Sequence, residues 1–308
     1  MFVHLVLPFL ILKTFSFNEL AHISQVYIQP FTCAHAHNDY LHPVPLYEAL
    51  GHGFTSIEAD VHLVDGELMV AHKRKYIQKG QTLETLYLSP LQRLIYLNDG
   101  TVFRNRVPLT LLIDIKTEAV TTYMALRKVL ARYQNMLTQY ESDRIRYGPI
   151  KIVISGHRAR KQMARQKVRF ATMDGRLPDL NYTGPNHFIE LISDKWTDIF
   201  TWNGKGVFPA EERKKLKGYV RLVHRQGKML RFWNTPENPV ENETAVWTEL
   251  LNAGVDFINT EDLDGLKAFL LNHDEFQNGH LATSNRNHKR IWMNQEILRK
   301  IPLDIVPW

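Results

Sequence analysis

Three clusters of polar residues in the first part of the chain combine residue types that hold metal ions and transfer protons. They are residues 35–39 (His-Ala-His-Asn-Asp), residues 58–62 (Glu-Ala-Asp-Val-His) with His72 further on, and residues 114–116 (Asp-Ile-Lys). Carboxylates are ligands for hard divalent cations, and imidazoles act as acids and bases near neutral pH. Together the clusters predict a metal-dependent site with acid–base catalysis.

The spacing of the acidic residues predicts that three carboxylates converge. In a β-strand the side chains at i and i+2 share a face, so Glu58 and Asp60 point together, as do Asp114 and Lys116. Carboxylates gathered in one place repel one another unless a cation neutralises them. An all-oxygen ligand set favours Mg²⁺ or Ca²⁺ over zinc. We therefore expect Glu58, Asp60 and Asp114 to bind one divalent cation.

Histidines near these carboxylates are candidates for a general acid and a general base. His35 ends the first predicted strand and His72 ends the return of a predicted hairpin, so the two are expected on opposite sides of the metal. Phosphodiester cleavage needs a base for the attacking hydroxyl and an acid for the leaving oxygen. Lys116 and the metal are expected to stabilise charge on the phosphoryl oxygens. His37 and Asn38 are expected to contact the substrate.

Alternating apolar and amphipathic segments predict the fold that must position these clusters. The predicted strands are 31–35, 54–61, 109–116, 150–155, 168–173, 188–193, 228–234 and 255–260. The predicted helices are 45–51, 89–96, 118–140, 159–164, 209–226, 242–252 and 264–272. Eight strands alternating with helices over about 245 residues predict an α/β fold of the (β/α)₈ or TIM barrel type, with an open doubly wound sheet as the alternative.

A β-hairpin is predicted as an insertion after the second strand. Residues 64–67 (Val-Asp-Gly-Glu) carry an Asp-Gly turn signal between short alternating stretches. Barrel enzymes place their active residues at the carboxyl ends of the strands. We therefore expect all three polar clusters at that end of the barrel, with the hairpin folded over it.

From the first strand to about Lys116, the sequence resembles the phosphatidylinositol phospholipase C-like phosphodiesterase superfamily, which includes glycerophosphodiester phosphodiesterases and sphingomyelinase D-type phospholipases. Residues 35–40 (His-Ala-His-Asn-Asp-Tyr) and 56–61 (Ser-Ile-Glu-Ala-Asp-Val) look most like the altered inheritance of mitochondria protein 6 group. The resemblance implies a TIM barrel, one Mg²⁺ or Ca²⁺ and a phosphoric diester hydrolase of lipid metabolism. Carried over residue by residue, it implies catalytic His35 and His72, the lysine Lys116, and metal ligands Glu58, Asp60 and Asp114.

Later parts of the chain resemble the superfamily less specifically. Residues 231–234 (Arg-Phe-Trp-Asn) resemble the late strand of sphingomyelinase D-like members, which implies a substrate-binding role for Trp233, and residues 255–260 resemble the final strand. Ala36 and His37 stand where glycerophosphodiesterases have Arg and Gly, no Glu-Asn-Thr follows, and Lys73 follows His72. The pattern is therefore closer to the sphingomyelinase D type. Either His35 or His37 fits the spacing as the first catalytic histidine.

Two alternative functions fit part of the pattern. Residues 35–37 also form the His-x-His pair that opens zinc-dependent amidohydrolase and phosphatase barrels. Those enzymes need further histidines after the middle strands, which here end near Asp174 and Asp194 with none adjacent. The other alternative is a non-catalytic, lipid-binding barrel.

Composition limits the partners. The 308 residues carry a net charge of +6. The basic runs are short and scattered, and no nucleic-acid-binding motif accompanies them. A phosphodiester or phospholipid substrate with contact to a membrane surface is expected, and nucleic acid is not. The single cysteine, Cys33, excludes a disulfide framework and a thiolate zinc site.

The domain prediction is a phosphodiesterase barrel over residues 28–275, followed by a tail, 276–308, that packs on its exterior. Residues 1–27 form an N-terminal apolar segment whose run at 2–12 is too short to span a bilayer and resembles a signal peptide. Glycosylation acceptors at Asn181 and Asn242 agree with secretion. The head group of the substrate and the oligomeric state are not specified by these patterns.

Overall fold

Eight parallel strands form one closed sheet. In order around the sheet they are β1 (Phe31–Ala36), β2 (Phe54–Val64), β4 (Leu109–Ile115), β7 (Ile150–Gly156), β9 (Thr172–Gly175), β10 (Ile189–Lys195), β11 (Met229–Trp233) and β12 (Phe257–Thr260). The ring closes because β1 pairs with β12 on one side and with β2 on the other. The predicted TIM barrel is therefore confirmed, and closure excludes the open doubly wound sheet.

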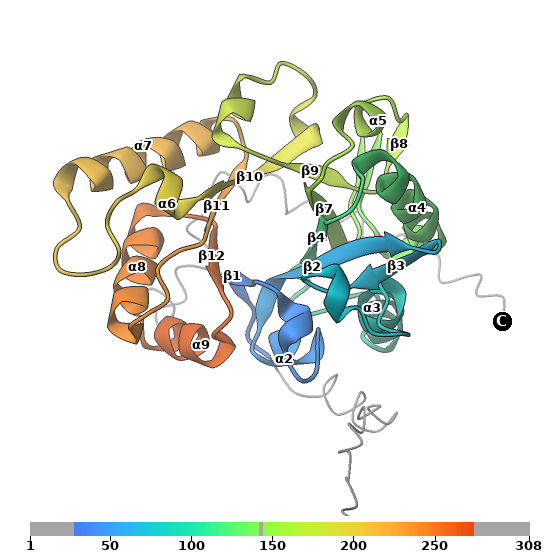
Figure 1. The fold of residues 1–308 in the computed structure, drawn as a ribbon, viewed down its shortest axis with the longest axis horizontal. Helices are drawn as coiled ribbons and strands as arrows, with labels where there is room; N and C mark the ends of the chain where they lie inside the picture. The colour runs from blue at the N-terminus through green and yellow to red at the C-terminus, as the bar shows by residue number, and fades with distance from the viewer. Residues whose placement is uncertain (1–27, 142–143, 274–308) are drawn as a thin grey trace, which may run out of the picture.

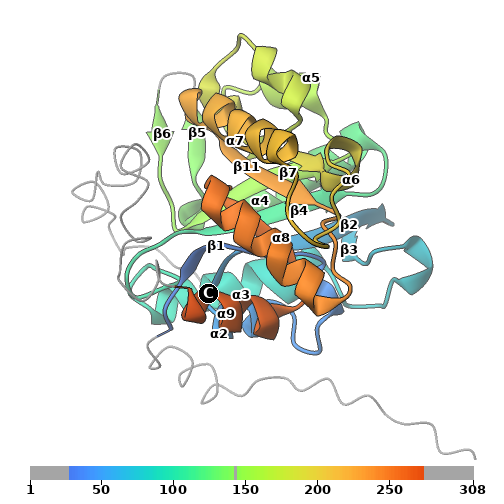
Figure 2. The ribbon, with the colours of Figure 1, turned by 90° about the vertical axis from the view of Figure 1, so that its left-hand side faces the viewer.

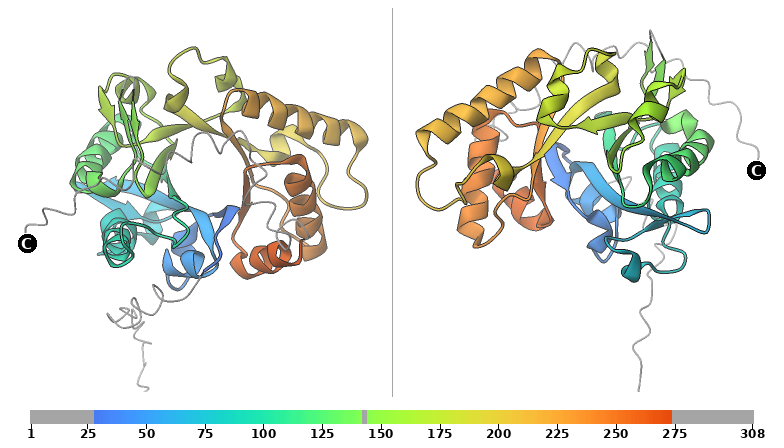
Figure 3. Two further views of the ribbon diagram at one scale, coloured as in Figure 1. Left: turned by 180° about the vertical axis from the view of Figure 1, so that it is seen from behind. Right: turned by 45° about the horizontal axis from the view of Figure 1, so that its top comes forward.

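Helices surround the sheet on its outer side (Figure 1). They are α2 (Tyr47–Gly51), α3 (Ser89–Leu97), α4 (Ala119–Arg132), α5 (Arg160–Ala164), α6 (Trp196–Ile199), α7 (Ala210–Arg225), α8 (Val240–Ala253) and α9 (Leu263–Asn272). In the side view α7, α8 and α9 cover one flank of the strands (Figure 2), and the view from the opposite end shows the same ring of strands inside the helices (Figure 3).

Short helical turns occupy several connections. They are η1 (Asp39–Leu41), η2 (Arg74–Tyr76), η3 (Glu84–Leu88), η4 (Gln134–Met136), η5 (Leu177–Asn181) and η6 (Asn186–Phe188). The structure describes residues 28–141 and 144–273, so the predicted N-terminal segment 1–27 and tail 276–308 lie outside the described residues. Within the described ranges, every helix is too short or too polar to serve as a membrane span.

The strands alternate between two cores. Leu111 and Ile113 of β4 belong to the large core that the helices cover, whereas Leu112 belongs to a small buried cluster inside the barrel. Leu112, Val153, Leu191 and Phe257 make up this interior cluster. Because side chains on one face of a strand recur every two residues, the interior position that follows Leu112 is Asp114. The polar site therefore lies directly beyond an apolar layer, toward the carboxyl ends of the strands.

The predicted hairpin after the second strand is present. β2 runs on past the barrel and pairs antiparallel with β3 (Glu67–Val70), with Val64 opposite Glu67. The two connecting residues, Asp65 and Gly66, have φ of 49° and 86°, as a type I′ turn requires.

Two predicted elements were wrong in extent. The predicted helix 118–140 ends at Arg132, and residues 139–141 form β5 (Gln139–Glu141) instead. The predicted strand 168–173 is two short strands, β8 (Val168–Arg169) and β9. β5 pairs with β8 and with β6 (Ile145–Arg146) in a small antiparallel sheet. Tertiary packing explains the difference, because buried Tyr140 stacks on His187 and lies under the Arg169 guanidinium.

Leu112→Ala tests the apolar layer beneath the site. Leu112 is fully buried, so the substitution is expected to lower the free energy of unfolding by about 2–5 kcal/mol through lost burial and a residual cavity. Leu41→Ala, at a position that is 61% exposed, is the matched control and is expected to cost far less. Urea unfolding of both variants measures the difference, and equal losses would contradict the assignment of Leu112 to the barrel interior.

Candidate metal centre and active site

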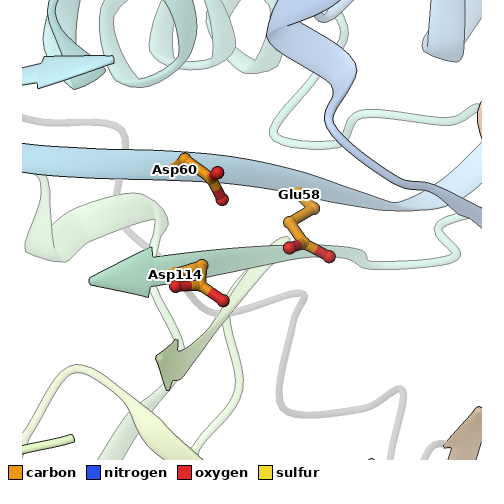
Figure 4. A group of neighbouring side chains, drawn as sticks. All are labelled: Glu58, Asp60 and Asp114. Atoms are coloured by element: carbon orange, nitrogen blue, oxygen red, sulfur yellow. The ribbon is translucent and has the colours of Figure 1, made fainter. Parts of the chain in front are cut away.

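Acidic residues of β2 and β4 meet at the carboxyl-terminal end of the barrel. Glu58 and Asp60 share one face of β2, and Asp60 lies beside Asp114 in the parallel register of the two strands. One carboxylate oxygen from each of the three residues lies within 4.8 Å of the others. Figure 4 shows Glu58 and Asp60 on one strand and Asp114 on its neighbour, with their carboxylates in a common space. The structure thus brings the three predicted ligands together.

Lys116, just after β4, neutralises two of these carboxylates. Its Nζ lies 3.0 Å from Oδ2 of Asp60 and 3.1 Å from Oδ1 of Asp114. Burial raises the pKa of Asp60 to about 6, and the ammonium of Lys116 only partly opposes this shift. Burial raises the pKa of Asp114 in the same way. Burial would lower the pKa of Lys116, but the two carboxylates raise it overall, so the lysine stays charged.

Glu58 is neutralised by an arginine from the opposite side of the barrel. Arg231 of β11 is buried, and its Nη1 donates to Oε2 of Glu58 at 2.7 Å and to Oδ1 of Asn259 at 3.2 Å. Its Nε donates to the hydroxyl of Ser193 at 3.2 Å. Burial alone would raise the pKa of Glu58, but nearby positive charge, chiefly that of Arg231, outweighs burial and holds it well below its usual value.

His35 is a buried member of the same network. Its Nδ1 lies 2.7 Å from the hydroxyl of Ser56, and its Nε2 lies 3.1 Å from Oε2 of Glu58 and 2.5 Å from Nη1 of Arg231. Burial, followed by the charge of Arg231, lowers the pKa of His35 to about 3, so the ring is neutral at pH 7. Because Arg231 can only donate, we assign Nε2 as the acceptor and place the proton on Nδ1, toward Ser56.

A second network surrounds His37. Its Nδ1 lies 3.1 Å from Oε1 of Glu261, the residue that follows β12, and Nδ2 of Asn38 donates to the same oxygen at 2.7 Å. Oδ1 of Asn38 lies 2.6 Å from the hydroxyl of Tyr40, which also lies 2.7 Å from Oδ2 of Asp60. Burial opposes the charged form of His37, but the hydrogen bond to Glu261 raises its pKa overall.

The hairpin returns His72 to the acidic cluster. The backbone N–H of Ala71 donates to the carbonyl of Asp60 at 3.3 Å, which ties the end of the hairpin to β2. Nδ1 of His72 lies 3.2 Å from Oδ2 of Asp60, and its side chain is 47% exposed. His72 is therefore an accessible imidazole in contact with a predicted metal ligand.

Trp233 contacts the neighbouring strand β10. It ends β11, two residues beyond Arg231, and its ring centroid is 5.8 Å from Nζ of Lys195. Arg231, Tyr40 and Glu261 were missing from the predicted site. The sequence could have indicated Arg231, because the two-residue period of a strand places it on the same face as Trp233. Tyr40 and Glu261 lie outside the strands, where that period gives no direction.

The three carboxylates pass a structural test for a metal site. Oδ1 of Asp60 is buried and has no hydrogen-bond partner among residues 28–141 and 144–273. A buried carboxylate oxygen without a partner is costly, and a cation removes that cost. The oxygen donors of Glu58, Asp60 and Asp114 are those that hard divalent cations prefer. These residues therefore form a candidate metal site.

A closed (β/α)₈ barrel with acidic and basic side chains at the carboxyl ends of its strands has the arrangement found in barrel enzymes. Residues 23–174 match the model of the AIM6-like phosphodiesterase domain, a stretch that contains β1, β2, β4 and the carboxylates of the candidate metal site. Over this stretch the chain is therefore similar to the AIM6-like phosphodiesterase domain, and it is a distant homologue of the altered inheritance of mitochondria protein 6 proteins.

Relatives with that name come from several fungi. The Eremothecium gossypii protein is 29% identical over 269 residues, which cover 77% of this chain and 69% of the relative. The Lachancea thermotolerans protein is 26% identical, with 75% and 63% of the two chains covered. The Arthroderma benhamiae homologue is 27% identical, with 76% and 82% covered. No solved structure matches this chain significantly. The resemblance to the altered inheritance of mitochondria protein 6 group that the sequence indicated is thereby confirmed.

Gly156→Ala tests the packing that holds Asp114. Gly156 ends β7 with φ of +64°, and an added Cβ would lie 2.1 Å from Oδ1 of Asp114 and 2.4 Å from the carbonyl of Ile115. The substitution is expected to lower the free energy of unfolding by about 1–3 kcal/mol and to weaken binding of Mg²⁺ measured by calorimetry, because Asp114 must move. The control is Gly218→Ala in α7, where a methyl group meets open space and the helix gains up to about 1 kcal/mol. Unchanged Mg²⁺ affinity in Gly156→Ala would contradict this close contact.

Arg231→Met tests the buried ion pair with Glu58. Removing the guanidinium leaves a buried carboxylate without its counter-charge, so the metal-free protein is expected to lose about 3–5 kcal/mol in the free energy of unfolding. Arg213→Met is the control, because Arg213 pairs with Glu249 near the surface and its loss is expected to cost about 1 kcal/mol or less. Denaturant unfolding in EDTA measures both. Similar losses in the two variants would show that Glu58 does not depend on Arg231.

Proposed function

We propose that this chain is a divalent-cation-dependent phosphoric diester hydrolase acting on a glycerophosphodiester or a phospholipid head group. One observation carries the proposal: Glu58, Asp60, Asp114 and Lys116 gather at the carboxyl end of the barrel, within a matched phosphodiesterase domain. The ligand chemistry supports Mg²⁺, with Ca²⁺ as the alternative, because both ions take carboxylate oxygens.

The charge of each side chain determines its role in the proposed reaction. Glu58, Asp60 and Asp114 would hold the cation, which when bound supplies positive charge next to the phosphoryl oxygens. Lys116 keeps its ammonium between two carboxylates and donates a hydrogen bond to a phosphoryl oxygen. The positive charge of Arg231 keeps Glu58 ionised. The barrel therefore presents fixed positive charge where negative charge develops in the reaction.

Two imidazoles carry the protons in this proposal. His72 reaches the site from the hairpin, and the second histidine is one of the pair His35 and His37 at the end of β1. One imidazole takes the proton of the attacking hydroxyl, and the other gives a proton to the leaving oxygen. An attacking water gives hydrolysis, and an internal hydroxyl of the substrate gives a cyclic phosphate.

Substrate presentation and location are part of the same proposal. Leu41 follows β1 and Tyr76 follows β3, and both are more than half exposed. Tyr76 lies in a basic stretch with Lys73, Arg74 and Lys75. Apolar side chains beside basic ones suit contact with a phospholipid surface. With the apolar run at 2–12 and the two glycosylation acceptors, we propose a secreted enzyme with a lipid or lipid-derived substrate.

The alternatives have less support. A zinc site on His35 and His37 would need both imidazoles, yet in the described part of the chain the candidate ligand group is made of carboxylates alone. His35 is held by Ser56, Glu58 and Arg231 instead. A non-catalytic lipid-binding barrel predicts binding to vesicles without turnover, which the following experiment detects.

A screen with and without metal tests the proposed function. Choline, ethanolamine and inositol phosphodiesters and ceramide phosphodiesters are incubated with the EDTA-treated protein and then with added Mg²⁺, Ca²⁺ or Zn²⁺. Turnover is expected only with Mg²⁺ or Ca²⁺, and phosphorus NMR separates hydrolysis from a cyclic product. Asp60→Asn is expected to lower turnover at least 100-fold and to weaken Mg²⁺ binding, because it removes a charged ligand.

Asp198→Asn is the matched control, because this exposed carboxylate pairs with Lys195 and lies outside the acidic group. It should leave turnover and Mg²⁺ affinity unchanged. Turnover in EDTA equal to that in Mg²⁺, or restoration by Zn²⁺ alone, would contradict the proposal. Binding to vesicles with no turnover of any diester would favour the non-catalytic barrel.

A further inference from the structure

We propose that His37 is the general acid of the reaction, that Glu261 is the positioning residue that orients it, and that His35 has a structural role. The inference rests on the proposed phosphodiesterase function and decides which histidine of the β1 motif meets the substrate. It is carried by the difference between two imidazoles only two residues apart.

Both ring nitrogens of His35 are already engaged. Its side chain is fully buried, with Ser56 at Nδ1 and with Glu58 and Arg231 at Nε2. A proton carrier must approach the substrate within hydrogen-bond distance, directly or through one water. His35 can do so only if the Arg231 network opens, so its geometry suits orientation of Glu58 and Arg231 rather than contact with substrate.

His37 has the opposite geometry. Its side chain is 25% exposed, and Nδ1 is held by Glu261, whose own side chain is 45% exposed. Within the described residues, Nε2 of His37 has no hydrogen-bond partner, so one nitrogen is anchored and the other is available. An imidazole held at one nitrogen by a carboxylate and open at the other is the usual arrangement of an acid–base histidine.

His37 and Glu261 are held together because each follows one of two neighbouring strands, β1 and β12. The backbone N–H of His37 donates to the carbonyl of Thr260 at 2.9 Å. Thr260 is the last residue of β12 and directly precedes Glu261, so His37 lies beside that end of the strand. Asn38 has φ of 49°, a left-handed conformation that asparagine tolerates, and its Nδ2 donates to Oε1 of Glu261 at 2.7 Å. Glu261 is thus held by two donors, which fixes the direction of its bond to His37.

The charges around His37 favour the protonated ring. Its charged or titratable neighbours are Glu58, Glu261, Glu237, Arg231 and His35. Burial disfavours the imidazolium, but the Glu261 hydrogen bond and the charge of Glu58 outweigh it and raise the pKa. A raised pKa favours the protonated ring, and a protonated imidazole is suited to donate rather than to accept a proton.

The proposed step balances as follows. The attacking hydroxyl oxygen forms a bond to phosphorus and loses its proton to His72. The bond from phosphorus to the leaving oxygen breaks with its electron pair on that oxygen. Nε2 of the His37 imidazolium gives its proton to this oxygen, so an alcohol departs and His37 becomes neutral.

Leaving-group dependence tests His37 directly. His37→Asn is expected to lower kcat by about 100- to 10,000-fold on a glyceryl phosphodiester, whose alkoxide leaves poorly without a proton. On the matching p-nitrophenyl phosphodiester, whose leaving group needs no proton, the loss should be less than about tenfold. Equal losses on the two esters would overturn the role of His37 as general acid.

Glu261→Gln tests the positioning role, with Glu237→Gln as the matched control. Glu237 is an exposed carboxylate that acts on His37 through space without a hydrogen bond. A general acid must be protonated, so activity falls as pH rises through its pKa. Loss of the Glu261 charge lowers that pKa and should move the alkaline limb of the kcat profile to lower pH by about one unit. Glu261→Asp should recover part of the shift, and Glu237→Gln should move the limb much less.

A titration of the imidazoles by NMR supplies a readout without metal or substrate. The pKa of His37, assigned by its loss in His37→Asn, is expected to fall in Glu261→Gln and to stay nearly unchanged in Glu237→Gln. An unchanged pKa of His37 in Glu261→Gln would overturn the pairing.

Failure of the inference differs from failure of the proposed function. If the wild-type protein turns over no diester, the proposed function fails, whatever the NMR titration shows. If the wild type is active and His37→Asn keeps full activity on both esters, only the inference fails. His35→Gln is expected to lower the melting temperature and weaken Mg²⁺ binding. Loss of glyceryl ester turnover in His35→Gln, with stability and Mg²⁺ affinity unchanged, would return the catalytic role to His35.

Discussion

Repulsion among Glu58, Asp60 and Asp114 is the constraint on which the rest of this site depends. Three carboxylates within 4.8 Å of one another, two of them buried, cannot all stay ionised without nearby positive charge. The chain provides two cations at different depths. Lys116 lies between Asp60 and Asp114 near the end of the strands, and Arg231 reaches Glu58 from across the barrel. Each cation serves a different part of the cluster.

The register of the strands arranges these side chains in successive layers along the barrel axis. β1 and β2 place His35 beside Ser56, and β2 and β4 place Asp60 beside Asp114. A step of two residues along either strand moves a side chain to the next layer. His35 therefore lies below the carboxylates that face the end of the barrel, whereas His37 lies one step further out. Depth within the barrel, rather than residue type, separates an imidazole that supports the site from one that can meet a ligand.

The sequence was sufficient where a local rule applied. The two-residue period paired Glu58 with Asp60 and Asp114 with Lys116, and the Asp-Gly turn predicted the hairpin that returns His72. Long-range contacts were beyond such rules. Arg231 lies 173 residues from Glu58 along the chain, and the two meet only because β11 and β2 belong to one closed ring.

The errors in secondary structure have the same origin. The helical pattern at 118–140 continues past Arg132 in the sequence, but the chain turns there so that Tyr140 enters a buried strand. Its partners, Arg169 and His187, come from later segments. A local propensity cannot include contacts of that range, and tertiary burial prevails over it.

The hydroxyl of Tyr40 links the network around His37 to the acidic cluster, and its position helps to explain why the two carboxylate oxygens of Asp60 have different contacts. The amide of Asn38 turns its Nδ2 toward Glu261, so its Oδ1 faces Tyr40. The tyrosine has one proton for two acceptors, Oδ1 of Asn38 and Oδ2 of Asp60. Oδ2 of Asp60 also contacts Lys116 and His72, whereas its Oδ1 has no hydrogen-bond partner in the described part of the chain. All donors around Asp60 thus gather on one oxygen, which leaves the other free to ligate a cation without breaking the network that holds the carboxylate in place.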